Sequence, residues 1–187
     1  MRPIAMSESP NRLDRIATVS QKIAAACGIF MMLLPAGLAV YVFGFFELLS
    51  YHPHIAPMDI PEDGLSPLSG AAVYAAMLVG TVPPLFALSH LRQLFSGYAT
   101  GAVFTVAAAR HLKVVASALI AMVLIRPVSG ILISLAISID LPPGGRALVV
   151  TFGSTEIWIG LAGVMVLVTA WIMGEAATMA EENKSFV

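Results

Sequence analysis

Arg126 is the side chain whose position points most directly to chemistry. It lies beside Pro127 inside an apolar run that extends from Val114 to Ile139. A charged side chain at bilayer depth is costly, and it usually faces the interior of a helix bundle, where it has a partner or marks a functional path. Arg126 therefore requires a partner, which the rest of the chain must supply.

The second apolar run offers partners for this cation. Pro83 and Pro84 each remove the hydrogen bond to the carbonyl group four residues earlier, which frees the carbonyls of Val79 and Gly80. Free carbonyls in lipid need donors, and an arginine carries five N–H groups. We predict that Arg126 clamps the proline-broken helix by donating to these two carbonyls.

Residue counting supports this pairing. At about 1.5 Å per residue, Gly80 lies about 15 Å from His90, and Arg126 lies about 20 Å from Lys113, so the two depths are compatible. Thr81 is a further acceptor nearby. The functional alternative is that an anionic headgroup, a quinone oxygen or a substrate carboxylate reaches the same guanidinium through a gap between helices.

Small and polar residues fall on one face of each of these two runs. In the second run they form a ridge that permits close helix approach, and in the third they predict a face that points inward. The ridge comprises Ala72, Ala76 and Gly80, and the inward face comprises Arg126, Ser129, Gly130, Ser134 and Ser138.

The histidines form two weaker constellations. His52 and His54, with Asp59, Glu62 or Asp63, have the types of ligand that a metal site uses, but the pair stands in a proline-rich segment. His90 and His111 are alternative axial haem ligands, and we favour histidines at the membrane interface. No metal or cofactor is expected.

The chain shows no catalytic signature. Its serines lack the histidine and carboxylate arrangement of a hydrolase, and a glycine-rich phosphate loop is missing. Cys27 is the single cysteine, which excludes an intrachain disulfide. A net charge of -1 gives no basic face for nucleic acid. We expect a protein that is not an enzyme and does not bind nucleic acid directly.

Composition places the chain in lipid: 58% of its 187 residues are hydrophobic and 11% are charged. Apolar runs long enough to cross a bilayer occupy about 23–46, 68–89, 114–139 and 157–173. We predict an all-α integral membrane bundle of four transmembrane helices, forming one membrane domain over 1–187. The connections are an external loop at 47–67, a cytoplasmic loop at 90–113 and a cytoplasmic tail at 174–187.

Lysine and arginine predict the orientation, because basic residues of short loops stay on the cytoplasmic side. The other side holds one basic residue, Arg146, which we expect to pair with Asp140 or Glu156. Both termini are therefore predicted to be cytoplasmic. The basic residues on the cytoplasmic side are Arg2, Arg12, Arg15, Lys22, Arg92, Arg110, Lys113 and Lys184.

Local signals organise the connections. Thr105 is placed to cap the third long helix, with Phe104 before it as a hydrophobic staple, and a break is expected between Ser96 and Gly101. The segment from Asp140 to Arg146 has the composition of a turn, and the first external loop is expected to be irregular and to lack a core of its own.

Several short motifs occur between the second apolar run and the C-terminus. They are Leu91-Arg-Gln-Leu-Phe, Gly101-Ala-Val-Phe-Thr, Arg110-His-Leu-Lys, and Gly174-Glu with the segment from Glu181 to Val187. This pattern resembles the bacterial domain-of-unknown-function 2975 family. The resemblance implies a small four-helix inner-membrane protein, and it suggests a membrane-attached regulatory role because some members are encoded beside helix-turn-helix regulators.

Two classes of function remain. We favour a non-enzymatic regulatory or accessory protein of the bacterial inner membrane that meets a protein partner through its cytoplasmic loop and tail. The alternative is a protein, or a transporter component, that binds a small molecule, lipid, quinone or cofactor through Arg126. Many transporters carry an internal repeat, which this chain lacks.

Overall fold

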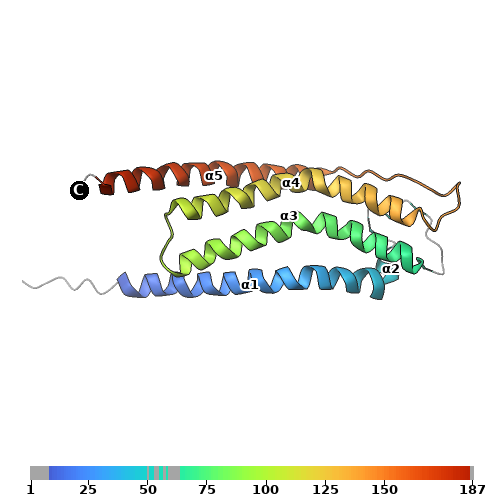
Figure 1. Cartoon of the computed structure of the whole chain (residues 1–187), viewed down its shortest axis with the longest axis horizontal. Helices are drawn as coiled ribbons and strands as arrows, with labels where there is room; N and C mark the ends of the chain where they lie inside the picture. Colours follow the sequence, from blue (N-terminus) through green and yellow to red (C-terminus); the bar gives the residue numbers. More distant parts are fainter. Residues whose placement is uncertain (1–8, 50, 53–54, 57, 59–63, 186–187) are drawn as a thin grey trace, which may run out of the picture.

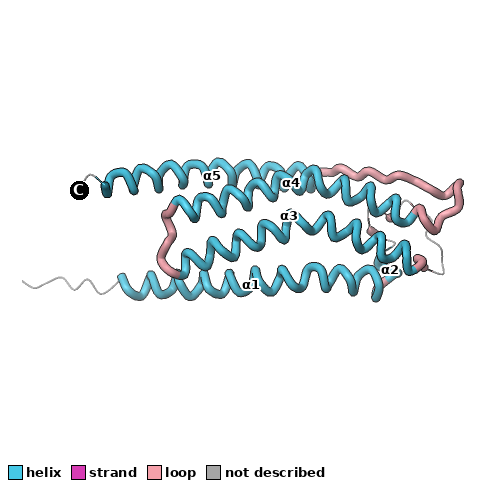
Figure 2. Tube along the Cα trace, viewed as in Figure 1, coloured by secondary structure: helices cyan, strands magenta, loops and turns pink. Residues whose placement is uncertain are grey.

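The computed structural model describes residues 9–49, 51–52, 55–56, 58 and 64–185. The described residues form helices joined by loops, without a strand (Figure 2), so the prediction of an all-α fold is confirmed. The helices are α1 (Ser9–Gly44), the short α2 (Phe46–Leu49), α3 (Pro67–Ala99), α4 (Val106–Ile137) and α5 (Ser154–Ser185).

Four of these helices, α1, α3, α4 and α5, are long and apolar enough to cross a membrane, as the sequence predicted. Each extends beyond its apolar run, because helix-forming polar residues continue the helix past the apolar segment. The difference is largest in α1, which begins at Ser9, and in α5, which continues to Ser185.

The long helices pack in series (Figure 1). In the described part of the chain, α1 packs against α3, α3 against α4 and α4 against α5, while α1 makes no close backbone contact with α4 or α5. The predicted bundle is therefore an open row of four helices. The two outer helices expose most of their apolar side chains, as expected for surfaces that face lipid.

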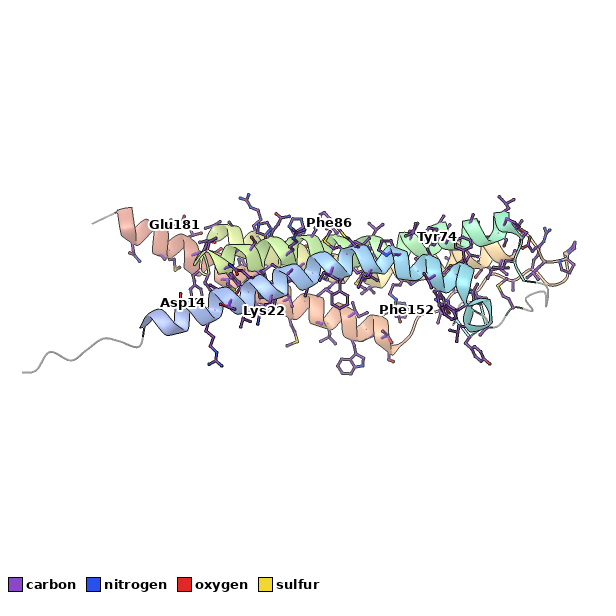
Figure 3. All side chains as sticks on the ribbon, turned by 90° about the horizontal axis from the view of Figure 1, so that it is seen from below. Asp14, Lys22, Tyr74, Phe86, Phe152 and Glu181 are labelled. Carbon is purple, nitrogen blue, oxygen red and sulfur yellow. The ribbon has the colours of Figure 1, made fainter. Side chains whose placement is uncertain are left out.

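The two ends of the row differ in character. One end, here called the α3–α4 end, holds the connection between those helices, the start of α1 and the last turns of α5. Asp14, Lys22 and Glu181 all lie toward this end (Figure 3). The opposite end, here called the α4–α5 end, holds α2 and the two remaining connections (Figure 1).

The connection between α3 and α4 has the predicted cap. The Thr105 hydroxyl accepts a hydrogen bond from the Ala108 amide at 3.1 Å. The break falls within the expected segment, because α3 ends at Ala99 and the chain turns at Gly101, whose φ of 85° favours glycine. The predicted staple is wrong, since Phe104 is 82% exposed.

The main apolar core lies at the α4–α5 end. Leu49 and Ile55, from the first interhelical segment, are fully buried there against Val73, Ile133 and Ile137. The segment between α1 and α3 therefore contributes side chains to the core formed by the long helices. The sequence predicted only that this segment has no core of its own. Burying one such side chain stabilises the fold by about 1.5–3 kcal/mol.

Polar side chains fasten α3 to α4. Ser69 donates its hydroxyl to the Ala136 carbonyl at 2.7 Å, and Ser129 donates to the Ala76 carbonyl at 2.8 Å. A side chain on Gly80 would place its Cβ 2.9 Å from the Ser129 hydroxyl. The small-residue ridge predicted for α3 does allow this close approach.

The link between α4 and α5 does not remain at the end of the row. After turns between 138 and 145, residues 146–153 form no helix and run back along α4 (Figure 1). The Ser134 hydroxyl, which is fully buried, accepts from the Val149 amide at 3.1 Å. As a result α5 begins alongside the middle of α4, at the level of Arg126.

Candidate functional site

A polar cavity of about 450 Å³ opens between the helices at the level where α5 begins. It is lined by α1, α3, α4 and the start of α5, and its size falls in the range of small-molecule sites, about 300–1,000 Å³. Arg126 and Glu156 are a basic and an acidic residue of its lining. The other lining residues are Leu38, Tyr41, His52, Met77, Gly80, Thr81, Met122, Ser129, Ile133, Thr151, Gly153, Ser154 and Thr155.

Arg126 is paired with Glu156 across this cavity. The Arg126 Nε atom lies 3.5 Å from Glu156 Oε1. The arginine side chain is 42% exposed, whereas the glutamate side chain is 10% exposed. Glu156 is therefore the more buried member of the ion pair, and the Arg126 side chain is partly exposed.

Glu156 is held in place by a second contact. Its Oε2 atom accepts a hydrogen bond from the Gly153 amide at 2.8 Å. Gly153 precedes the first residue of α5 and Glu156 is the third residue of that helix, so this contact is one half of a capping box. A carboxylate in the first turn also interacts favourably with the helix dipole.

The structure gives Arg126 a different partner from the one expected. The hydrogen bonds among the described residues do not join Arg126 to the carbonyl of Val79 or Gly80, and Thr81 donates its hydroxyl to the Leu78 carbonyl of its own helix. The physical reason is that α5 begins beside Arg126 and brings the charged acceptor Glu156 within 3.5 Å of Nε. Ser129, one turn farther along α4 on the same face, makes the hydrogen bond to α3.

Pro83 and Pro84 lie within α3, which remains helical on both sides of them and bends near its middle (Figure 1). Prolines inside a helix commonly cause such a bend. The bend brings the Gly80 turn against Ser129 and leaves Thr81 at the cavity wall. The prolines therefore shape the cavity that Arg126 occupies.

Hydrogen-bond donors gather at this site. Arg126 contacts Glu156 through Nε, and among the described residues the amides of Ser154 and Thr155 donate no backbone hydrogen bond. The latter two belong to the first turn of α5, where amide groups point out of the helix and carry partial positive charge. This arrangement favours a ligand that presents an oxygen acceptor.

Of the histidines, His90 and His111 lie away from the cavity and His52 lines it. The Nδ1 atoms of His90 and His111 lie 3.0 Å apart at the α3–α4 end, so one ring donates to the other. His52 lines the cavity, and His54 lies outside the described residues. Within the described part of the chain, no three His, Cys, Asp or Glu side chains converge as metal ligands.

Arg146 and Asp140 are not partners of each other. Arg146 donates from Nε to the Leu141 carbonyl at 3.1 Å. Asp140 accepts from the amide and from the hydroxyl of Ser66, each at 2.7 Å, and these bonds lower the pKa of the Asp140 carboxyl below its ordinary value. The carboxylate ties the end of α4 to the start of α3.

The fold and the site define an all-α protein with four helices of membrane-spanning length and a polar cavity between them. The chain belongs to the family described as protein of unknown function (DUF2975), which it matches over residues 45–187. The resemblance seen in the sequence is thereby confirmed, and α1 lies before the matched region. Neither the curated proteins nor the solved structures include a match to this chain.

Proposed function

We propose that this protein is a non-enzymatic, multi-pass protein of the bacterial inner membrane that binds a small molecule through Arg126. Both termini lie on the cytoplasmic side, so the α3–α4 end is cytoplasmic and the α4–α5 end is external. The ligand presents an oxygen acceptor, such as a carboxylate, a phosphate or a carbonyl, to the guanidinium.

The cavity carries this proposal. Arg126 pairs with Glu156 through Nε and lines a cavity of about 450 Å³ beside the first turn of α5. A purely structural arginine would fill its donors with carbonyls of neighbouring helices, because each unpaired donor in lipid is costly. Helix starts within membranes bind the anionic groups of substrates in the same manner.

The depth of the cavity fits a membrane ligand. Thirteen residues of α4 separate Lys113 from Arg126, which corresponds to about 20 Å along the helix. With a hydrocarbon core about 30 Å thick, Arg126 lies in the external half of the bilayer. His52, from the segment between α1 and α3, also lines the cavity and connects it to the external side.

Mass spectrometry of the purified protein, released intact from its membrane mimic, tests this function. We expect a bound small molecule on the wild-type protein and its loss in Arg126→Gln. Arg110→Gln is the matched control, because Arg110 is on the same helix, is exposed and lies outside the cavity. Equal occupancy in both variants would contradict the proposal.

A second candidate function is a regulatory or accessory role through a protein partner at the cytoplasmic end. One observation favours it: α5 overhangs the row. Gly174 already lies beside Ala109, near the start of α4, so the turns that include Glu181 and Glu182 extend beyond that start (Figure 1). Such a charged, exposed helix end is available for contact.

The orientation behind both functions is testable with reporter fusions. Reporters at the N-terminus, after Ala99 and after Val187 should indicate the cytoplasm, and one near Asp59 should indicate the external side. For the partner role, a protein co-purified with the wild type should be lost from Glu181→Lys/Glu182→Lys and kept in Arg126→Gln. Retention in the tail variant would argue against that role.

A further inference from the structure

A second cavity of about 430 Å³ adjoins the Arg126 cavity along α1. The two share Leu38, Tyr41 and Thr81, so they lie side by side at these residues. The second cavity differs in chemistry. Apart from the hydroxyls of Tyr41 and Thr81 at the shared boundary, it is lined by apolar side chains and Gly37.

The lining of this apolar groove follows a single stripe of α1. Its residues recur at three- and four-residue intervals, which places them on one face of a helix. The stripe spans twelve residues, which corresponds to about 16 Å along the helix axis, and it occupies one face of α1. It consists of Phe30, Leu33, Leu34, Gly37, Leu38 and Tyr41.

Gly37 keeps the groove open. A Cβ atom placed on Gly37 would meet nothing within 4 Å, whereas one on Gly80 would meet Ser129 at 2.9 Å. The absence of a side chain at Gly37 therefore serves no close approach within the protein. It leaves a depression at the middle of the stripe, where a slender ligand can lie.

We propose that the ligand of the Arg126 cavity is a single-chain anionic amphiphile, with its carboxylate or phosphate head at Arg126 and its alkyl chain in the α1 groove. This inference rests on the proposed function and adds the class of ligand. A groove along one face of a single helix accommodates one chain, and the charge of the partly exposed guanidinium selects an acidic head.

The electrostatics of the cavity agree with an acidic head. Glu156 contacts Nε of Arg126 through Oε1 and accepts the Gly153 amide through Oε2, so both of its oxygens are engaged within the protein. The positive end of the α5 dipole adds to the attraction. The head also bonds the exposed Ser154 and Thr155 amides.

The direction of the groove agrees with a lipid-like ligand. It begins at Tyr41, at the level of Arg126, and runs along α1 toward Phe30, nearer the α3–α4 end. With the orientation proposed above, the head lies in the external half of the bilayer and the chain points to its middle. A lipid of the external leaflet has the same polarity.

Binding to the full-length protein in nanodiscs of zwitterionic lipid tests the inference. The probes are dodecanoate and dodecyl phosphate, with acetate, inorganic phosphate and dodecanol as comparisons. We expect saturable binding of one or both acidic amphiphiles, at least tenfold weaker binding of the comparisons, and a tenfold loss of amphiphile affinity in Arg126→Gln. The ratio between the two amphiphiles distinguishes a carboxylate from a phosphate head.

Gly37→Leu tests the chain site separately, because a Cβ atom at Gly37 meets nothing within 4 Å and the larger side chain fills part of the groove. This substitution should lower the affinity for the amphiphiles at least tenfold and leave the affinity for acetate and phosphate unchanged. Gly97→Leu, which also meets nothing within 4 Å and lies outside the groove, should bind like the wild type. Should Gly37→Leu fold poorly, Leu33→Ser, at a half-exposed groove position, should show the same selective loss.

The outcomes separate the two levels of the proposal. Arg126-dependent binding of acetate or phosphate as tight as that of the amphiphiles, with no effect of Gly37→Leu, would overturn the chain site and leave the proposed function standing. Amphiphile binding that is unchanged in both Arg126→Gln and Gly37→Leu would indicate bulk lipid contact. That result would overturn the chain site and the proposed function. Dodecanol bound as tightly as dodecanoate would overturn the acidic head.

Discussion

Ser129 donates its hydroxyl to the carbonyl oxygen of Ala76 at 2.8 Å, where α3 and α4 approach closely beside Gly80. This bond fastens one helix to the other. Arg126, three residues earlier, lies on the same face of α4, and it lines the same cavity as Ser129, where its side chain pairs with Glu156.

Enlarging Gly80 should separate these two helices. In Gly80→Ala the new Cβ lies 2.9 Å from the Ser129 hydroxyl and 3.2 Å from its Cβ, so the hydrogen bond to Ala76 must shift or break. We expect a loss of about 1–3 kcal/mol in unfolding free energy, as for overpacking elsewhere. Equilibrium unfolding in detergent measures it.

The control for Gly80→Ala is Gly37→Ala, which meets nothing within 4 Å and should be neutral or slightly stabilising. In a Ser129→Gly background, Gly80→Ala should cost much less, because the obstructing atoms are gone. An equal cost in both backgrounds would show that the close approach at Gly80 is not the constraint.

Removing the Ser134 hydroxyl should loosen the segment that leads into α5. Ser134→Ala leaves the Val149 amide without its acceptor inside the row of helices, at a cost of about 1–3 kcal/mol. Faster hydrogen exchange at Val149 should accompany the loss. Ser117→Ala is the control, because that exposed hydroxyl bonds only its own helix at Lys113. If both variants behave alike, the segment is fastened elsewhere.

Asp140 should make the stability of the protein depend on pH in the acid range. The Ser66 amide and hydroxyl lower the pKa of Asp140 in the folded state. The stabilisation is therefore fully present above the unfolded-state pKa, about 3.9, and is lost as the pH falls through the lower, folded-state pKa. Asp140→Asn should reduce stability at neutral pH and flatten the acid limb of a melting profile. An unchanged limb would contradict this role.

Arg126 should be coupled energetically to Glu156 and not to the prolines of α3. Because the arginine is partly exposed, we expect a coupling on the order of 0.5–1 kcal/mol in a double-mutant cycle of Arg126→Leu with Glu156→Gln. In a cycle of Arg126→Leu with Pro83→Ala/Pro84→Ala, the coupling free energy should be near zero. A strong coupling to the prolines would restore the carbonyl clamp that the sequence suggested.

Much of the fold could be predicted from the sequence because its signals are local. Apolar runs located the four long helices, and the Thr105 cap followed from residue type and position. The series packing could not be predicted, since apolar faces that meet lipid and apolar faces that meet another helix have the same composition. The burial of Leu49 and Ile55 likewise depends on tertiary contacts.

The candidate site was only partly predictable. The sequence singled out Arg126 by its position in an apolar run, but it placed Glu156 in an external segment. One signal could have found the pairing: a glutamate three residues after Gly153 matches the acidic half of a capping box and marks a helix start. That the start lies beside Arg126 depends on how far the segment after Arg146 runs back along α4, which residue counting alone does not give.

The most direct test of the account is a distance measurement at Arg126. Solid-state NMR with ¹⁵N-labelled arginine side chains and ¹³C-carboxyl-labelled dodecanoate, in lipid bilayers, measures the dipolar coupling between guanidinium nitrogen and carboxyl carbon. We predict a coupling that corresponds to direct hydrogen bonding and disappears in Arg126→Lys, which lacks the planar guanidinium. No coupling at saturating ligand, or a coupling that persists in Arg126→Lys, would contradict ligand binding at Arg126.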